Sequence, residues 1–144
     1  MRFLIINGPN LNLLGKRDPG QYGTGTYEEL CKQIGDHAQA RGDRVSFFQS
    51  NHEGAIIDVI QQARGCFDGM VINPGAYAHY SYAIHDALLD SPIPAIEVHI
   101  SDIAEREDWR RVSVTAPACK AMIAGRGFAG YREALELLRE QTSC

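Results

Sequence analysis

Short apolar runs alternate with longer amphipathic stretches along this chain, and the alternation strongly limits the folds open to it. The runs are rich in Val, Ile and Phe, and most lack the polar–apolar alternation of a half-exposed strand. Such runs are typical of strands buried on both faces of a parallel sheet. We expect strands at residues 3–7, 44–49, 68–73, 94–100 and 119–125.

The amphipathic stretches predict helices with marked starts. Thr26 with Glu29, and Ser50 with Glu53, match the capping box, in which two side chains satisfy free backbone donors at a helix start. The predicted helices cover residues 26–41, 51–64, 81–90, 103–110 and 131–141.

The repeated strand–helix units predict an α/β protein with a flavodoxin-like, doubly wound, five-stranded parallel sheet and helices on both faces. The chain has 144 residues, which fit a single catalytic domain spanning 1–144. Ligands of such sheets bind beyond the carboxyl ends of the strands. The residues that follow each strand are therefore the candidates for a functional site.

Composition excludes several classes of partner. The net charge of −4 and the lack of a basic stripe argue against nucleic acid and anionic membranes as partners. The apolar start is too short for a signal peptide, and no run is long enough to span a membrane. The cysteines, which form no CxxC pair, are typical of a reduced, cytoplasmic protein with free thiols. They are Cys31, Cys66, Cys119 and Cys144.

The loop after the first strand carries Asn10, Arg17 and Tyr22 and is long for a strand–helix connection. Long loops in compact domains are often functional lids. A guanidinium near a Tyr stabilises the phenolate, so such a Tyr can act as a general base. On this feature alone, an exposed aromatic residue packed on a neighbour is the simpler interpretation.

The third strand is followed by Asn73, Pro74 and Gly75. A Pro-Gly turn brings backbone N–H groups close to a ligand, and the next helix would point its positive end at the site. An anionic ligand is expected there, although a plain turn before a capped helix fits the sequence equally well.

The fourth strand places Glu97, His99 and Ser101 on one side of an otherwise apolar segment. Burying Glu and His together is unfavourable unless they are hydrogen-bonded, and such pairing favours the protonated imidazole that can donate a proton. Arg106 and Arg110 follow on a predicted helix and would share one face. They could hold a carboxylate or hydroxyls, or pair with neighbouring acidic residues.

Two other motifs are interpreted as structural. The GxGxxG spacing at residues 125–130 lies after the last strand, whereas a dinucleotide site needs it on the first strand–helix turn. The histidines form no i, i+4 pair of the kind that holds zinc on a helix. We therefore expect no metal and no cofactor.

Several long segments, in order and over nearly the whole chain, resemble the type II 3-dehydroquinate dehydratases. They are NGPNLNLLGKRDPGQYG from Asn7, QSNHEG from Gln49, INPGAYAHYSYAIHDAL from Ile72, EVHISDI from Glu97, and a stretch from Arg106 to Ser113. The resemblance implies a flavodoxin-like subunit, assembled as a homododecamer of trimers, that converts 3-dehydroquinate to 3-dehydroshikimate and water.

The resemblance also implies roles for individual residues. Tyr22 would be the general base and Arg17 would lower the proton affinity of its hydroxyl. His99 would be the general acid, oriented by Glu97, and Asn10 would help to hold a water against an enolate oxygen. Substrate-binding positions would be Asn73, Gly75, His79, Asp86, Ile100, Ser101, Arg106 and Arg110.

This chain departs from the usual family pattern at His85, Asp102 and Ala104, none of which is a catalytic position. The departures concern the surroundings of the site and the contacts between subunits. The sequence leaves open whether the enzyme serves aromatic biosynthesis or quinate breakdown.

Other interpretations explain less of the sequence. A receiver-type signalling domain would need acidic residues after the first strand, where Asn7 and Asn10 stand. A flavin-binding electron carrier would need a Ser/Thr-rich phosphate loop there. A Schiff-base mechanism would need a lysine at the site, and Lys16, Lys32 and Lys120 stand in the lid, mid-helix and at the wrong end of a strand.

Overall fold

The computed structural model of the chain describes residues 1–143 and is built on a five-stranded sheet in the order β2-β1-β3-β4-β5. All neighbouring strands are parallel, which confirms the predicted flavodoxin-like fold. The predicted thiol at Cys144 lies outside the described residues. The strands are β1 (Arg2–Asn7), β2 (Arg44–Gln49), β3 (Gly69–Asn73), β4 (Ala95–His99) and β5 (Ala121–Ala124).

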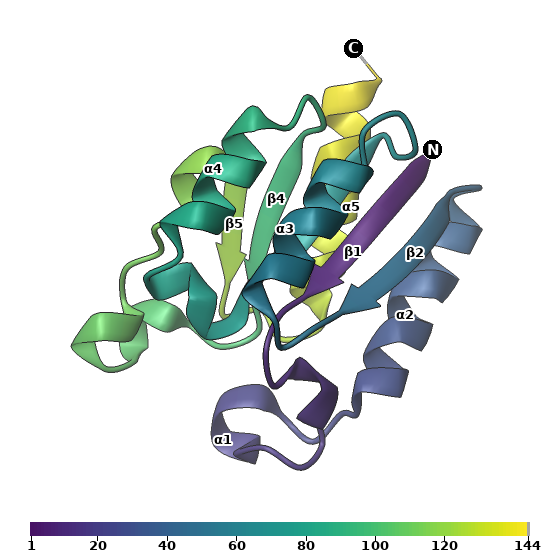
Figure 1. Ribbon diagram of the computed structural model, residues 1–144. Helices are drawn as coiled ribbons and strands as arrows, with labels where there is room; N and C mark the ends of the chain where they lie inside the picture. Colours follow the sequence, from purple (N-terminus) through teal and green to yellow (C-terminus); the bar gives the residue numbers. More distant parts are fainter. Residues whose placement is uncertain (144) are drawn as a thin grey trace.

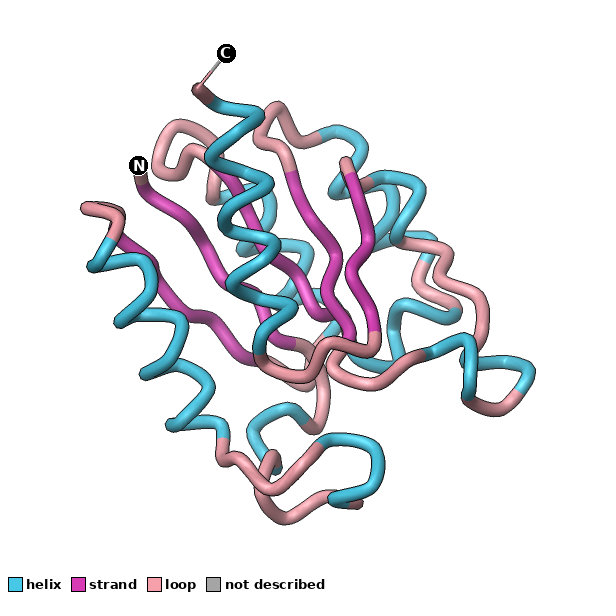
Figure 2. The backbone as a smooth tube through the Cα atoms, turned by 180° about the vertical axis from the view of Figure 1, so that it is seen from behind, coloured by secondary structure: helices cyan, strands magenta, loops and turns pink. Residues whose placement is uncertain are grey.

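Helices cover both faces of the sheet (Figure 1, and from behind in Figure 2). The helices α3 (Glu53–Gln62) and α4 (Tyr82–Asp90) lie on one face. The helices α2 (Tyr27–Ala40) and α5 (Ala129–Thr142) lie on the other. A short helix, α1 (Pro19–Tyr22), lies beyond the carboxyl ends of the strands (Figure 1).

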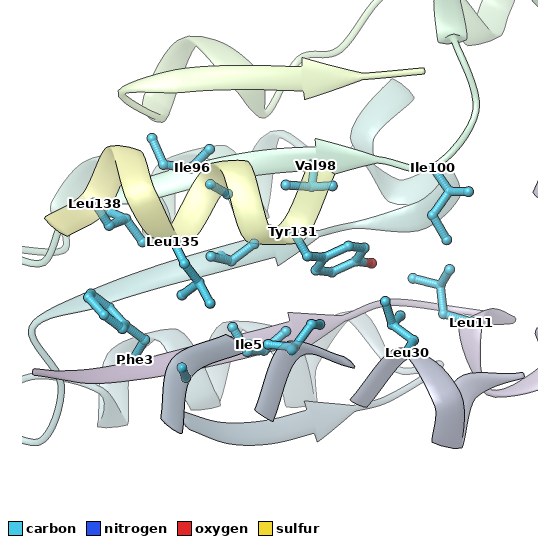
Figure 3. Packing of buried hydrophobic residues seen from close by; sticks show 14 of the residues in the cluster. Phe3, Ile5, Leu11, Leu30, Ile96, Val98, Ile100, Tyr131, Leu135 and Leu138 are labelled. Atoms are coloured by element: carbon cyan, nitrogen blue, oxygen red, sulfur yellow. The ribbon is translucent and has the colours of Figure 1, made fainter. Parts of the chain in front are cut away.

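The two faces of the central strands contribute to two separate cores. On β1, Phe3 and Ile5 pack with residues of α2 and α5, whereas Leu4 and Ile6 pack with residues of α3 and α4 (Figure 3 draws the first cluster). These four side chains are almost completely buried. Burial on both faces explains why the central runs lack polar–apolar alternation.

The prediction of strands buried on both faces is wrong for the two edge strands. Along β2, Arg44, Ser46 and Phe47 are exposed, and in β5 Met122 is exposed. Each edge strand has a neighbouring strand on one side only and is less completely covered by helices.

The helix starts are only partly as predicted. The capping box at Thr26 is confirmed, because its hydroxyl accepts from the Glu29 amide at 3.1 Å while the Glu29 carboxylate accepts from the Thr26 amide at 3.3 Å. The box predicted at Ser50 is wrong, because α3 begins only at Glu53. The Glu53 carboxylate instead accepts a hydrogen bond of 2.6 Å from the Ser81 hydroxyl, which also caps α4.

The prediction of a helix at residues 103–110 is also wrong. The segment forms two short 3₁₀ turns, Ile103–Glu105 and Asp108–Arg110, and Arg106 between them is extended. The Asp102 carboxylate accepts from the Ala104 amide at 3.1 Å. This bond caps the first 3₁₀ turn, and the extended Arg106 then ends that turn.

No helix within residues 1–143 has the length and apolar character needed to cross a membrane.

Candidate active site

A pocket lies beyond the carboxyl ends of β1, β3 and β4, and residues of α1 and of the segment that follows β4 also line it. The sequence-predicted site residues that line it come from four separate stretches of chain. They are Asn10, Arg17, Tyr22, Asn73, Gly75, His79, His99, Ile100, Ser101, Arg106 and Arg110.

The loop between β1 and α2 contributes a tyrosine held by two guanidinium groups. Asp18 starts α1 by accepting from the Gly20 amide at 2.9 Å, and this short helix places Tyr22 at its end. The Tyr22 hydroxyl accepts from Arg17 at 3.0 Å and from Arg106 at 3.3 Å. The two guanidinium groups therefore hold the Tyr22 hydroxyl at the pocket.

Arg106 connects the loop between β1 and α2 to the end of β4. Besides Tyr22, its guanidinium contacts the Ser101 hydroxyl at 3.1 Å. The expectation that Arg106 and Arg110 share a helix face is wrong, since no helix forms there, yet both line the pocket. Arg110 forms an ion pair of 2.8 Å with Glu107.

A buried carboxylate stands behind His99. The His99 Nε2 lies 2.8 Å from the Glu97 carboxylate, whose side chain is 0% exposed. Ser113 donates to the same carboxylate at 2.5 Å, and Thr115 donates to its other oxygen. Three partners thus compensate for the loss of water around a buried carboxylate. They fix Glu97, and Glu97 fixes the ring of His99, which lines the pocket.

His79 faces His99 with a ring centroid separation of 6.3 Å. Its Nδ1 lies 2.8 Å from the Val112 carbonyl and must donate, because a carbonyl can only accept. Burial lowers the pKa of His79, and the nearby Arg110 charge lowers it further, whereas the bond to Val112 and the Glu97 carboxylate oppose this shift. A neutral ring that donates from Nδ1 keeps Nε2 as an acceptor.

The turn after β3 brings backbone against the pocket wall. Gly75 has a φ of 61°, and a Cβ there would lie 3.1 Å from atoms of Pro9. Glycine is therefore favoured here, both for its conformation and for the close approach. A 3₁₀ turn, Gly75–His79, separates β3 from α4, and the first residues of α4 do not line the pocket. The prediction that this helix points its positive end at the site is wrong.

Two of the predicted site residues lie outside the pocket lining. Glu97 lies behind His99, as described above. Asp86 lies on α4 with a side chain that is 75% exposed, 3.2 Å from His85. It does not line the pocket of its own chain.

In residues 1–143 no group of three or more His, Cys, Asp or Glu side chains is arranged to hold a metal ion.

Residues 1–139 match the family model described as Dehydroquinase class II. The chain belongs to this family. Among the relatives of this class II dehydroquinase, the 3-dehydroquinate dehydratase of Thermotoga neapolitana is 54% identical over 143 residues, covering 99% of this chain and 97% of the relative. The 3-dehydroquinate dehydratase of Clostridium acetobutylicum is 53% identical, with 99% of each chain covered.

The solved type II dehydroquinase of Butyrivibrio crossotus has the same fold as this class II dehydroquinase. The TM-score is 0.95 at 52% identity, over 96% of this chain and 97% of the other. These matches confirm the resemblance seen in the sequence.

Sequence reasoning missed one buried partner of the site in this class II dehydroquinase. Thr115 is completely buried against Glu97, from a loop position 18 residues further along the chain. A lone Thr in an irregular segment gives no periodic signal, so its contact with β4 became visible only in the folded chain.

Proposed function

We propose that this chain is a 3-dehydroquinate dehydratase that eliminates water from 3-dehydroquinate to give 3-dehydroshikimate, with no Schiff base and no cofactor. The observation that carries the proposal is one pocket that joins a tyrosine held by two guanidinium groups to a histidine backed by a buried carboxylate. The elimination needs a base for a carbon-bound proton and an acid for a departing hydroxyl, and this pair supplies both.

In the first step, the Tyr22 phenolate takes a proton from the carbon next to the ketone. The electron pair of the broken C–H bond forms a C=C bond, and the carbonyl oxygen becomes an enolate oxygen. Asn10, which lines the pocket, would hold a water against this oxygen. Arg17 stabilises the phenolate before the transfer.

In the second step, the enolate re-forms the carbonyl, the electron pair of its C=C bond forms a new C=C bond to the next carbon, and the C–O bond of the hydroxyl on that carbon breaks. His99 gives this group a proton, so that it leaves as water. The Glu97 carboxylate stabilises the protonated ring and sets its orientation. Tyr22 then releases its proton to solvent and His99 takes up a proton from solvent, so both side chains return to their starting states.

The substrate is proposed to bind through its carboxylate and hydroxyls. Asn73 and the backbone of Ile100 and Ser101, together at the carboxyl ends of β3 and β4, would hold the carboxylate. His79 would accept from a substrate hydroxyl through Nε2, and Arg110 would donate to another.

Asp86 has a place in this function only if subunits associate. It is exposed on α4, outside the pocket of its own chain. We therefore assign it to a pocket of a neighbouring copy in the homododecamer of trimers that the family resemblance implies. A cytoplasmic location is proposed with it, since the Cys66 thiol is exposed and unpaired.

The direct test is the absorbance of the conjugated enone formed from 3-dehydroquinate by purified protein in the presence of a chelator. Steady enone formation supports the proposal, and no absorbance change with folded protein contradicts it. Borohydride added with substrate should leave activity intact, whereas irreversible inactivation would indicate a lysine imine.

Replacing Thr115 by Val is expected to lower kcat by about tenfold with little change in KM, because one donor to the Glu97 carboxylate is lost and His99 is held less firmly. Enone absorbance measures the effect. Thr142→Val is the matched control, since within residues 1–143 the Thr142 hydroxyl bonds to Leu138, Arg139 and Met1, at the far end of α5. Equal kcat values for the two variants would show that Thr115 has no such role.

A further inference from the structure

Three buried side chains form a hydrogen-bonded chain below the pocket. Asn7 ends β1, Asn73 ends β3, and Tyr131 stands near the start of α5. The Asn73 amide nitrogen lies 3.0 Å from the Tyr131 hydroxyl, which lies 2.6 Å from the Asn7 amide oxygen. Asn7 and Tyr131 are 0% exposed and Asn73 is 3% exposed. Tyr131 has no role in the proposed proton transfers or in the proposed substrate contacts.

The direction of every hydrogen bond among these three side chains follows from one backbone group. The Gly75 N–H, 3.1 Å from Asn73, can only donate, so it must meet the Asn73 oxygen. The Asn73 nitrogen then faces Tyr131 and donates to its hydroxyl oxygen. The hydroxyl hydrogen is left for the Asn7 oxygen. Burial raises the pKa of Tyr131, so this hydrogen stays in place.

Apart from the two Asn side chains, the surroundings of Tyr131 are apolar. The ring belongs to the apolar cluster of α2, α5 and the sheet. Figure 3 shows the hydroxyl pointing toward the carboxyl ends of the strands, near Ile100 and Leu11. A polar atom in such a cluster is unfavourable unless it is hydrogen-bonded.

One N–H of Asn73 remains after these bonds are counted. An amide nitrogen carries two hydrogens, and Tyr131 takes one of them. Asn73 also lines the pocket, next to Ile100 and Ser101. The amide cannot rotate about its side-chain bond without breaking its bonds to both Gly75 and Tyr131.

We propose that Tyr131 is a positioning residue, whose hydroxyl locks the Asn73 amide so that its second N–H faces the bound carboxylate. This inference rests on the proposed function, in which Asn73 binds the carboxylate. It adds that a side chain of α5, outside the pocket lining, sets the affinity for the anionic end of the substrate.

The test is Tyr131→Phe, which keeps the ring and removes the hydroxyl. KM for 3-dehydroquinate should rise about tenfold, as expected for one oriented hydrogen bond to a charged group, while kcat changes by less than about threefold. In an Asn73→Ala background the same substitution should leave KM unchanged, because Tyr131 acts through Asn73. Leu138→Ala is the control, since it opens a cavity on the same helix, against Gly69 at the opposite end of β3. It should lower the melting temperature and leave KM unchanged.

Two results would overturn the proposal: an unchanged KM in folded Tyr131→Phe protein, or a KM rise of equal size in the Asn73→Ala background. A readout independent of turnover is hydrogen exchange of the Asn73 side-chain amide by NMR, which should be slow in the wild type and faster in Tyr131→Phe. If the wild type does not turn over 3-dehydroquinate but exchange responds in this way, the proposed function fails and the lock on Asn73 stands. Equal exchange rates in the wild type and in Tyr131→Phe would show that the Tyr131 hydroxyl does not hold the Asn73 amide in place.

Discussion

Tyr22→Phe protein is expected to fold normally and to lose turnover of 3-dehydroquinate by a factor on the order of 10²–10⁴, the usual contribution of a general base. The Phe ring can keep its place beneath Arg17, whose guanidinium carbon lies 3.9 Å from the ring centroid. Only the oxygen that would take the proton is lost. Enone absorbance measures the activity, and a thermal melt verifies the fold.

The control for this variant is Tyr80→Phe. Tyr80 is 60% exposed and does not line the pocket, so removing its hydroxyl should leave kcat and KM within about twofold of the wild type. If Tyr22→Phe protein retained as much activity as this control, Tyr22 would not be the base.

His99→Ala is the second change with a large expected effect, a loss of kcat on the order of 10²–10⁴-fold. The variant lacks the acid that protonates the departing hydroxyl, and Glu97 keeps only its bonds from Ser113 and Thr115. Added imidazole, which fits the space of the deleted ring, should restore part of the rate. The measurement is kcat with and without imidazole.

The matched control for His99→Ala is His37→Ala. His37 pairs with Glu136 at 2.8 Å between α2 and α5, away from the pocket. Its loss should leave kcat unchanged, and imidazole should have no effect. A His99→Ala enzyme with wild-type kcat would exclude His99 as the acid.

The fold could be predicted from the sequence because each element carries its own local signal. The run at 3–7 is apolar at every position but the last, and the structure buries both of its faces. Predicted strands and main helices therefore match the observed ones to within about two residues, the usual uncertainty of such boundaries. The site residues could be located as well, since parallel strands bring their carboxyl ends to one edge.

The predictions that failed concern segments whose structure depends on contacts between residues far apart in the sequence. The segment at 103–110 has helical spacing, but Arg106 is extended between two short turns and reaches across to Tyr22, 84 residues away. Tyr131 has the spacing of a core residue on α5, and nothing local distinguishes its hydroxyl from that of any other buried Tyr. Its partner Asn7 is 124 residues away.

The most direct test of the account is deuterium exchange at the carbon next to the ketone of 3-dehydroquinate, followed by mass spectrometry of recovered substrate in heavy water. If Tyr22 removes the proton before His99 releases the hydroxyl, His99→Ala protein should load deuterium into the substrate while forming little product. Tyr22→Phe protein should load none. Exchange by Tyr22→Phe as fast as by His99→Ala would contradict the assignment of Tyr22 as the base.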